Sequence, residues 1–141
     1  PDVVDLLGAL RVVAESRVAE VSQLLRTYIT ARDDLEPVPA RELMQRAKQG
    51  LVTVLDVRPP EEYAAGHVPG AINVTLDALS SHLRRLPKGR EVIAYCRGPY
   101  CLLSVDAVAM LRDKGYQARR MEDGFPEWKA AGMPVEETSL D

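Results

Sequence analysis

Hydrophobic and polar residues follow two different patterns along this chain. Over residues 1–36, apolar side chains recur every three or four positions, which predicts one amphipathic helix of about eight turns. Beyond residue 39, short apolar runs alternate with stretches of helical spacing. We therefore expect a linker near Pro37-Val38-Pro39, between a long N-terminal helix (1–36) and a domain formed by residues 37–141. The helical stripe comprises Leu7, Leu10, Ala14, Val18, Val21, Leu25 and Tyr28.

The pattern of residues 37–141 predicts strands that are separated by helices. The runs at 52–57 and 91–95 are apolar on both faces, as in strands that are buried between two layers of helices. We expect an α/β fold with a mainly parallel sheet, covered by helices on both faces, and a ligand site at the carboxyl ends of the strands. The expected helices are 40–49, 77–86, 102–114 and 125–131, and the expected strands are 52–57, 72–74, 91–95 and 117–121.

Charge and composition narrow the function classes. Of the 18 basic and 21 acidic side chains, four and seven lie in residues 1–36, which leaves 14 of each in residues 37–141. Binding to a phosphate backbone requires clustered positive charge, so this chain is a poor candidate for DNA binding. It contains no run of about 18 apolar residues and no export leader, so we expect a cytoplasmic protein that does not cross a membrane. The first residue is Pro1 rather than Met, which indicates a fragment or a processed product.

The two cysteines carry the main chemical signal. Cys96 ends an apolar strand and opens a loop to Cys101, after which a helix is predicted. The amides and the positive dipole end of such a helix point into the loop, where they stabilise a thiolate, so we expect a lowered pKa at Cys96. Both cysteines lie in one loop, so they cannot join distant segments and are better suited to reactivity. His67 and His82 lack the spacing of a zinc site, and we expect neither a metal nor a cofactor.

Several motifs, in order and in register, resemble the rhodanese domain over about residues 37–136. The resemblance implies a sulfurtransferase: Cys96 takes sulfane sulfur from a donor such as thiosulfate or a polysulfide and passes it, from a persulfide, to a thiophilic acceptor such as a thiol or cyanide. The motifs are Leu55-Asp56-Val57-Arg58, Glu62-Tyr63, the Gly66 to Asn73 segment, the Cys96 loop, Gly124-Phe125-Pro126-Glu127-Trp128 and Gly132-Met133-Pro134-Val135.

Within this resemblance, Cys96 is the catalytic residue and the loop binds the substrate. Arg97 is the only cation of the loop, so we expect it to steer an anionic donor or balance the persulfide. Asp56 and Arg58 are expected to support the loop through a charge network, and His67 to hydrogen-bond its own turn. The six-residue loop is similar to that of sulfurtransferases, whereas related phosphatases have one residue more, which disfavours phosphatase activity. The substrate-binding loop comprises Arg97, Gly98, Pro99, Tyr100, Cys101 and Leu102.

The N-terminal helix resembles the dimerisation helix of ArsR-type repressors that carry a fused rhodanese domain. This implies a homodimer formed through the helix and a DNA-binding part that precedes Pro1; the alternative is a helix that packs on its own domain. Cys101 also leaves two interpretations open. It is either a small apolar residue at a helix start or a second thiol that forms a Cys96-Cys101 disulfide, which would make the chain a sulfur or redox sensor.

Overall fold

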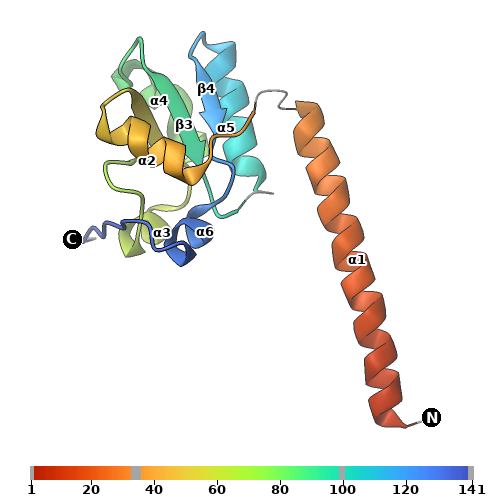
Figure 1. The fold of residues 1–141 in the computed structure, drawn as a ribbon. Helices are drawn as coiled ribbons and strands as arrows, with labels where there is room; N and C mark the ends of the chain where they lie inside the picture. Colours follow the sequence, from red (N-terminus) through yellow and green to blue (C-terminus); the bar gives the residue numbers. More distant parts are fainter. Residues whose placement is uncertain (1, 33–35, 99–100, 140–141) are drawn as a thin grey trace. The chain divides into compact units, whose positions relative to one another are not determined.

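The computed structural model describes residues 2–32, 36–98 and 101–139, which belong to two compact units, 1–34 and 35–141. The first unit contains the helix α1 (Val3–Arg32), and the second contains every strand and the remaining helices (Figure 1). Val38 is fully buried and forms a parallel bridge with Met121. The segment expected to be a free linker therefore contributes to the second unit, beside the sheet.

The core of the second unit is a four-stranded sheet in which all strands run parallel, in the order β2-β1-β3-β4. The register pairs Val54 of β1 with Ile93 of β3, and Ile93 with Arg119 of β4. A parallel sheet needs a crossover between strands, and each crossover here contains a helix. The strands are β1 (Val52–Asp56), β2 (Ile72–Asn73), β3 (Glu91–Tyr95) and β4 (Ala118–Arg120).

Helices cover both faces of the sheet, as the apolar runs predicted (Figure 1). One face packs on α4, the following 3-10 turn and α5, whose inward residues include Leu79, Leu83 and Val108. The other face packs on α2 and α6 through Leu43 and Trp128. The helices are α2 (Ala40–Lys48), α3 (Pro60–Ala65), α4 (Leu76–His82), α5 (Leu102–Asp113) and α6 (Phe125–Ala130), and the 3-10 turn is Leu83–Arg85.

Most predicted elements are confirmed to within a few residues, and the fold class is confirmed. Two differences have a physical reason. The helix expected over 77–86 becomes a 3-10 turn after His82, before the turn at Pro87. The short helix α3 was missed, because its six residues are too few for a periodic pattern, although a proline at its first position is a typical helix start.

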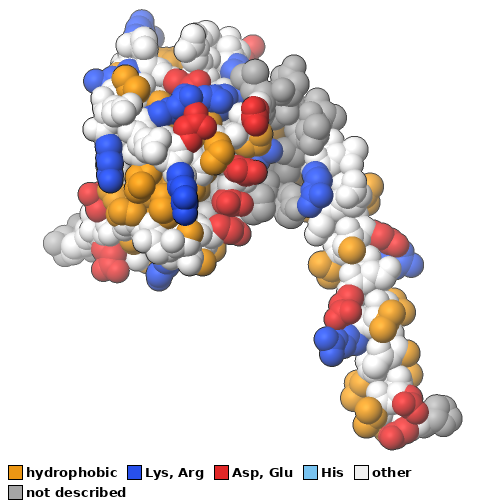
Figure 2. Space-filling model, in the orientation of Figure 1, with side chains coloured by type: hydrophobic (Ala, Val, Ile, Leu, Met, Phe, Trp, Pro, Cys, Tyr) orange, Lys and Arg blue, Asp and Glu red, His pale blue; other side chains and the backbone are white. Residues whose placement is uncertain are grey.

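The helix α1 carries a large amount of exposed apolar surface (Figure 2). Leu7, Leu10 and Val21 of the predicted stripe are each more than half exposed. Val12 is 66% exposed and lies outside that stripe, so apolar side chains are not confined to one narrow seam. Ion pairs of Arg11 with Glu15 and of Arg17 with Glu20 add polar contacts along the helix. Among the described residues, no helix has the length and hydrophobicity required to cross a bilayer.

Candidate functional site

Cys96 directly follows the central strand β3. Its side chain continues the alternation of the strand, in which successive residues point to opposite faces of the sheet. Val92 and Ala94 face the α4 and α5 side of the sheet, and Cys96 belongs to the same apolar cluster. Tyr95 faces the opposite cluster, with α2 and α6. Cys96 is only 1% exposed, so its sulfur is enclosed by the core at the carboxyl end of the strand. This position agrees with the expected site edge, but the thiol is more deeply buried than a loop residue would suggest.

The two cysteines pack together at the start of α5, and each thiol shifts the pKa of the other. The hydrogen bond from Cys96, assisted by the backbone N–H groups of Arg97 and Leu103, lowers the pKa of Cys101 to about 5. The same hydrogen bond and the burial of the thiol raise the pKa of Cys96. The expectation of a lowered pKa at Cys96 is therefore wrong: the helix start favours the thiolate at Cys101, whose sulfur receives more backbone donors.

The first residues of the loop are held by the start of α6. The backbone N–H of Phe125 donates to the carbonyl of Cys96 over 3.0 Å. Gly124 lies so close to the loop that an added Cβ would overlap the backbone of Arg97 and Gly98. Glu127 caps the N-terminus of this helix by accepting a hydrogen bond from the Gly124 N–H. The start of α6 thus borders the cysteine loop, and its glycine is required by this close approach.

Asp56 and Arg58 form a buried ion pair at the end of β1. The carboxylate and the guanidinium make two-pronged contact, with Nη2 to Oδ2 at 2.7 Å, and Arg58 also donates to the carbonyl of Gly66. Tyr95 donates its hydroxyl hydrogen to Asp56 over 2.7 Å. Burial alone would lower the pKa of Arg58, but the hydrogen bond and charge of Asp56 raise it. This is the charge network that the sequence predicted, with Tyr95 as a member it did not identify.

The same network connects β1 to α6. The Arg58 guanidinium lies 4.3 Å from the ring centroid of Phe125, close enough for a cation–π contact. Phe125 in turn holds the Cys96 carbonyl through its N–H. Burial, followed by the charge of Asp56, raises the pKa of Tyr95, so its hydroxyl stays protonated as a donor. Asp56 and Arg58 therefore support the cysteine loop through packing.

His67 is a structural residue of its turn, as expected. It is buried, its Nδ1 donates to the Tyr63 carbonyl over 2.7 Å, and its ring stacks on Tyr63 at a centroid distance of 3.7 Å. Its backbone also pairs with Glu136 in both directions. Trp128 is buried in the core and donates its indole hydrogen to the Pro134 carbonyl over 2.7 Å. These contacts of His67 and Trp128 stabilise the turn and the core of the domain, and they do not involve the cysteines.

Arg97 is paired with a carboxylate that sequence analysis did not connect to it. Its Nε lies 2.9 Å from Glu62 Oε1 and 3.1 Å from Oε2, and Nη2 lies 2.8 Å from Oε1. Glu62 comes from α3, 35 residues earlier in the chain. Its hydrogen bond and charge raise the pKa of Arg97, and the charges of Cys96 and Cys101 add to this. The cation of the loop is thus both close to the sulfurs and paired with a carboxylate.

The remaining loop residues are placed only in part. Gly98 is half-buried and its carbonyl accepts the N–H of Cys101 over 3.2 Å. Leu102 begins α5 and is 36% exposed. Pro99 and Tyr100 lie outside the described residues. Over the described ranges, His, Cys, Asp and Glu side chains nowhere gather into a group that could hold a metal.

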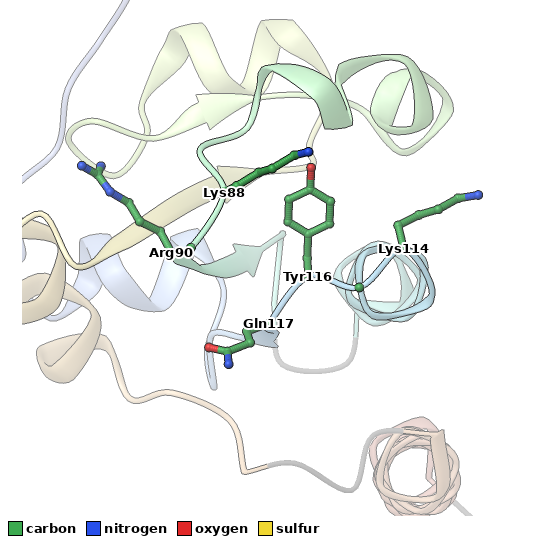
Figure 3. A pocket seen from close by; sticks show the side chains of 7 residues that line it. Lys88, Arg90, Lys114, Tyr116 and Gln117 are labelled. Carbon is green, nitrogen blue, oxygen red and sulfur yellow. The ribbon is translucent and has the colours of Figure 1, made fainter.

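A separate hollow of about 480 Å³ lies at the amino ends of β3 and β4, opposite the end that carries Cys96 (Figure 3). It is lined by Lys88 and Arg90, which precede β3, and by Lys114 and Tyr116, which precede β4. Because the strands are parallel, these residues lie at the amino ends and Cys96 at the carboxyl end. The hollow is therefore not the pocket in which the cysteine would meet a substrate.

Comparisons with known proteins agree with this geometry. A sulfurtransferase from Allochromatium vinosum is 31% identical over 85 residues, which are 60% of this chain and 78% of that protein. The crystal structure of the BH2092 protein from Bacillus halodurans is 27% identical, with a TM-score of 0.69, and covers 83% of this chain and 86% of that one.

A longer relative contains both parts of the chain. The HTH-type transcriptional regulator Rv0324 from Mycobacterium tuberculosis is 42% identical over 136 residues, which are 96% of this chain. The chain spans 59% of the length of that regulator. The family model of the rhodanese-like domain matches residues 39–131, which include β1, the Cys96 loop and α6. With the motifs, the parallel sheet and the cysteine at its carboxyl edge in agreement, the chain belongs to the rhodanese-like domain family.

Proposed function

We propose that this chain is a sulfurtransferase module in which Cys96 carries sulfane sulfur as a persulfide. Membership of the rhodanese-like family supports this function, as does the sulfurtransferase relative. The observation that carries the proposal is the position of Cys96 at the carboxyl end of β3, in the same apolar cluster as Cys101 at the start of α5. Above pH 5 the pair holds one proton and one negative charge between its two sulfurs, and a shift of that proton to Cys101 leaves the charge on Cys96, where it can attack.

The proposed first step begins with a proton transfer from Cys96 to the Cys101 thiolate. The Cys96 thiolate then attacks the outer sulfur of the donor. With thiosulfate, a new S–S bond forms to Cys96, the bond between the two thiosulfate sulfurs breaks, and sulfite leaves with the electron pair. The N–H of Arg97 donates to the cysteine sulfur and stabilises the charge of the persulfide. In the second step, a thiol or cyanide attacks the outer sulfur and restores the Cys96 thiolate.

The test is intact-mass analysis of the protein after treatment with thiosulfate or polysulfide. A gain of one sulfur atom is expected for the wild type and for Cys101→Ser, with a slower gain in that variant because its general base is missing. Cys96→Ser should gain no sulfur. Sulfur addition to Cys101 in the Cys96→Ser variant, at the wild-type rate, would contradict the role of Cys96.

A second candidate function is a sulfur sensor, and the same thiol pair favours it. The Cys101 thiolate can attack the inner sulfur of a Cys96 persulfide, which forms a Cys96-Cys101 disulfide and releases hydrosulfide. The 42% identity to an HTH-type regulator supports a sensory role. A fast turnover of thiosulfate and cyanide would favour the enzyme. A loss of two hydrogens that depends on Cys101, together with slow turnover, would favour the sensor.

The helix α1 supports a further part of this proposal, a homodimer formed through its apolar surface. Leu7, Leu10 and Val21 expose apolar side chains that a second copy of the helix would cover. In this arrangement, DNA is bound only by a part of a longer protein that precedes Pro1; the similarity to an HTH-type transcriptional regulator supports a DNA-binding part outside this chain. We place the protein in the cytoplasm, where reducing conditions keep both cysteines available for sulfur chemistry.

A further inference from the structure

The cation of the cysteine loop is already paired with a carboxylate. Arg97 contacts both carboxylate oxygens of Glu62 through Nε, at 2.9 and 3.1 Å, and reaches Oε1 again through Nη2. This two-pronged geometry is the strongest form of a side-chain ion pair and fixes the guanidinium plane. The charge of Glu62 therefore reduces the net positive charge that Arg97 presents to a substrate.

Two further charged groups near the loop, Arg58 and Glu127, supply no free positive charge. Arg58 is buried and is held by Asp56. Glu127 lies beside the loop, since its Oε1 is 3.9 Å from where a Cβ on Gly98 would stand. Glu127 thus adds a second carboxylate beside the loop, and the charge of Arg58 is already balanced by Asp56. A doubly charged anion meets electrostatic resistance in such surroundings.

The common sulfur donors differ in their negative charge. Thiosulfate carries two negative charges, whereas a persulfide of a small uncharged thiol, R–S–SH, carries at most one. The persulfide step also balances without a further reactant: the Cys96 thiolate bonds to the outer sulfur, the S–S bond of the donor breaks, and R–S⁻ leaves with the electron pair. The proton of the donor remains on the new Cys96 persulfide.

We propose that Glu62 is a specificity-determining residue that, by neutralising Arg97, makes the site prefer persulfide donors of low charge to thiosulfate. This inference rests on the proposed function, in which Cys96 accepts sulfane sulfur. Glu62 acts through Arg97 and is a positioning residue, since it belongs to α3 and not to the loop. Its removal should change the choice between donors, which a purely structural role would not do.

The experiment compares the rates at which the intact full chain gains one sulfur atom from thiosulfate and from 2-mercaptoethanol persulfide. The wild type should react faster with the persulfide. Glu62→Gln frees the Arg97 charge and should raise the thiosulfate rate, relative to the persulfide rate, by roughly tenfold. Glu61→Gln is the matched control: it removes the same charge from the same helix, and Glu61 forms no ion pair with any described residue. Its rate ratio should change by less than about twofold.

Three outcomes test the role of Glu62 in donor preference. A roughly tenfold change in Glu62→Gln alone, which shrinks at high salt because exposed charges are screened, supports the proposal. An unchanged ratio in Glu62→Gln, or a wild type that prefers thiosulfate, overturns it while Cys96 keeps its role as sulfur carrier. A wild type that gains sulfur from neither donor contradicts the proposed function itself, and this inference with it.

Discussion

Gly124 lies directly against the backbone of Gly98, with no room for a side chain between the start of α6 and the cysteine loop. We predict that Gly124→Ala pushes the loop away and destabilises the domain by about 1–3 kcal/mol, the usual cost of overpacking. Sulfur loading of Cys96 should fall at least about tenfold, since a small misplacement of reacting groups is costly. Denaturant unfolding and intact mass measure the two effects.

Gly98, on the other side of the same contact, provides the control for that variant. Among the described residues, a Cβ added at Gly98 would meet only Glu127 Oε1, at 3.9 Å, and the backbone is not in a left-handed conformation. Gly98→Ala should therefore change the free energy of unfolding by less than about 0.5 kcal/mol. Equal destabilisation by the two alanines would show that Gly124 is not the point of close approach.

The thiol pair predicts an unusual pH titration. The pKa of Cys101 is lowered to about 5 by the hydrogen bond from Cys96 and by the backbone N–H groups at the helix start. Thiolate absorbance near 240 nm should therefore rise with a midpoint near pH 5, and Cys96→Ala should move that midpoint towards the ordinary value of about 8.5. A wild-type midpoint above about pH 8 would contradict the hydrogen-bonded thiolate.

The same pair predicts how stability depends on pH. A thiolate favoured in the folded state stabilises that state fully above the pKa of the unfolded thiol, about 8.5. The contribution falls as the pH decreases towards 5 and is absent below that pH. The stability difference between the wild type and Cys101→Ala should accordingly shrink from pH 8 to pH 5, as measured by urea unfolding. A difference that grows over this range would have the wrong sign.

The buried ion pair at the end of β1 predicts a large loss of stability. Asp56→Asn leaves the Arg58 guanidinium in the core without its countercharge, which should cost about 3–5 kcal/mol. Tyr95→Phe removes one hydrogen bond to Asp56 and one from the Val68 N–H, and should cost about 1–3 kcal/mol. Urea unfolding measures both variants.

An exposed pair provides the control for these substitutions. Arg11 and Glu15 contact each other on α1 at 2.9 Å, with both side chains more than 60% exposed. Glu15→Gln should change the free energy of unfolding by less than about 0.5 kcal/mol, as is usual for surface ion pairs. If Asp56→Asn costs no more than this control, the network at β1 does not stabilise the fold.

The exposed surface of α1 predicts self-association through one stripe. Val21 belongs to the stripe and is 55% exposed, whereas Val12 is 66% exposed and lies outside it. Val21→Glu should raise the dissociation constant of the dimer at least about tenfold, because it buries a charge in an apolar contact. Val12→Glu should change it by less than about threefold. Analytical ultracentrifugation measures both; a monomeric wild type, or equal effects, would contradict the helix dimer.

Local patterns along the sequence were enough to predict most of the fold. The apolar run of β3 and the helical spacing of α5 each predict their element without any knowledge of the rest of the chain. The six-residue helix α3 has no such pattern, because one and a half turns cannot establish a period. Its proline at the first position was the one available signal.

The site was predictable where it depends on neighbours in the chain and not where it depends on contacts between distant segments. The position of Cys96 follows from a strand that ends and a helix that begins. Glu62 and Arg97 are 35 residues apart, so no local spacing indicates their ion pair. The division of charge between Cys96 and Cys101 depends on which sulfur the backbone donors reach, and the order of residues does not contain that information.

The alternation that places Tyr95 towards one layer of helices and Cys96 towards the other has a practical consequence. Cys96 belongs to the cluster built on α4 and α5, whereas its chain neighbour Tyr95 belongs to the cluster built on α2 and α6, so the packing of both clusters positions the Cys96 sulfur. No fragment that lacks either cluster could present it correctly. Sulfur uptake can therefore serve as a sensitive reporter of whether the entire α/β unit has assembled, including variants altered far from the thiols.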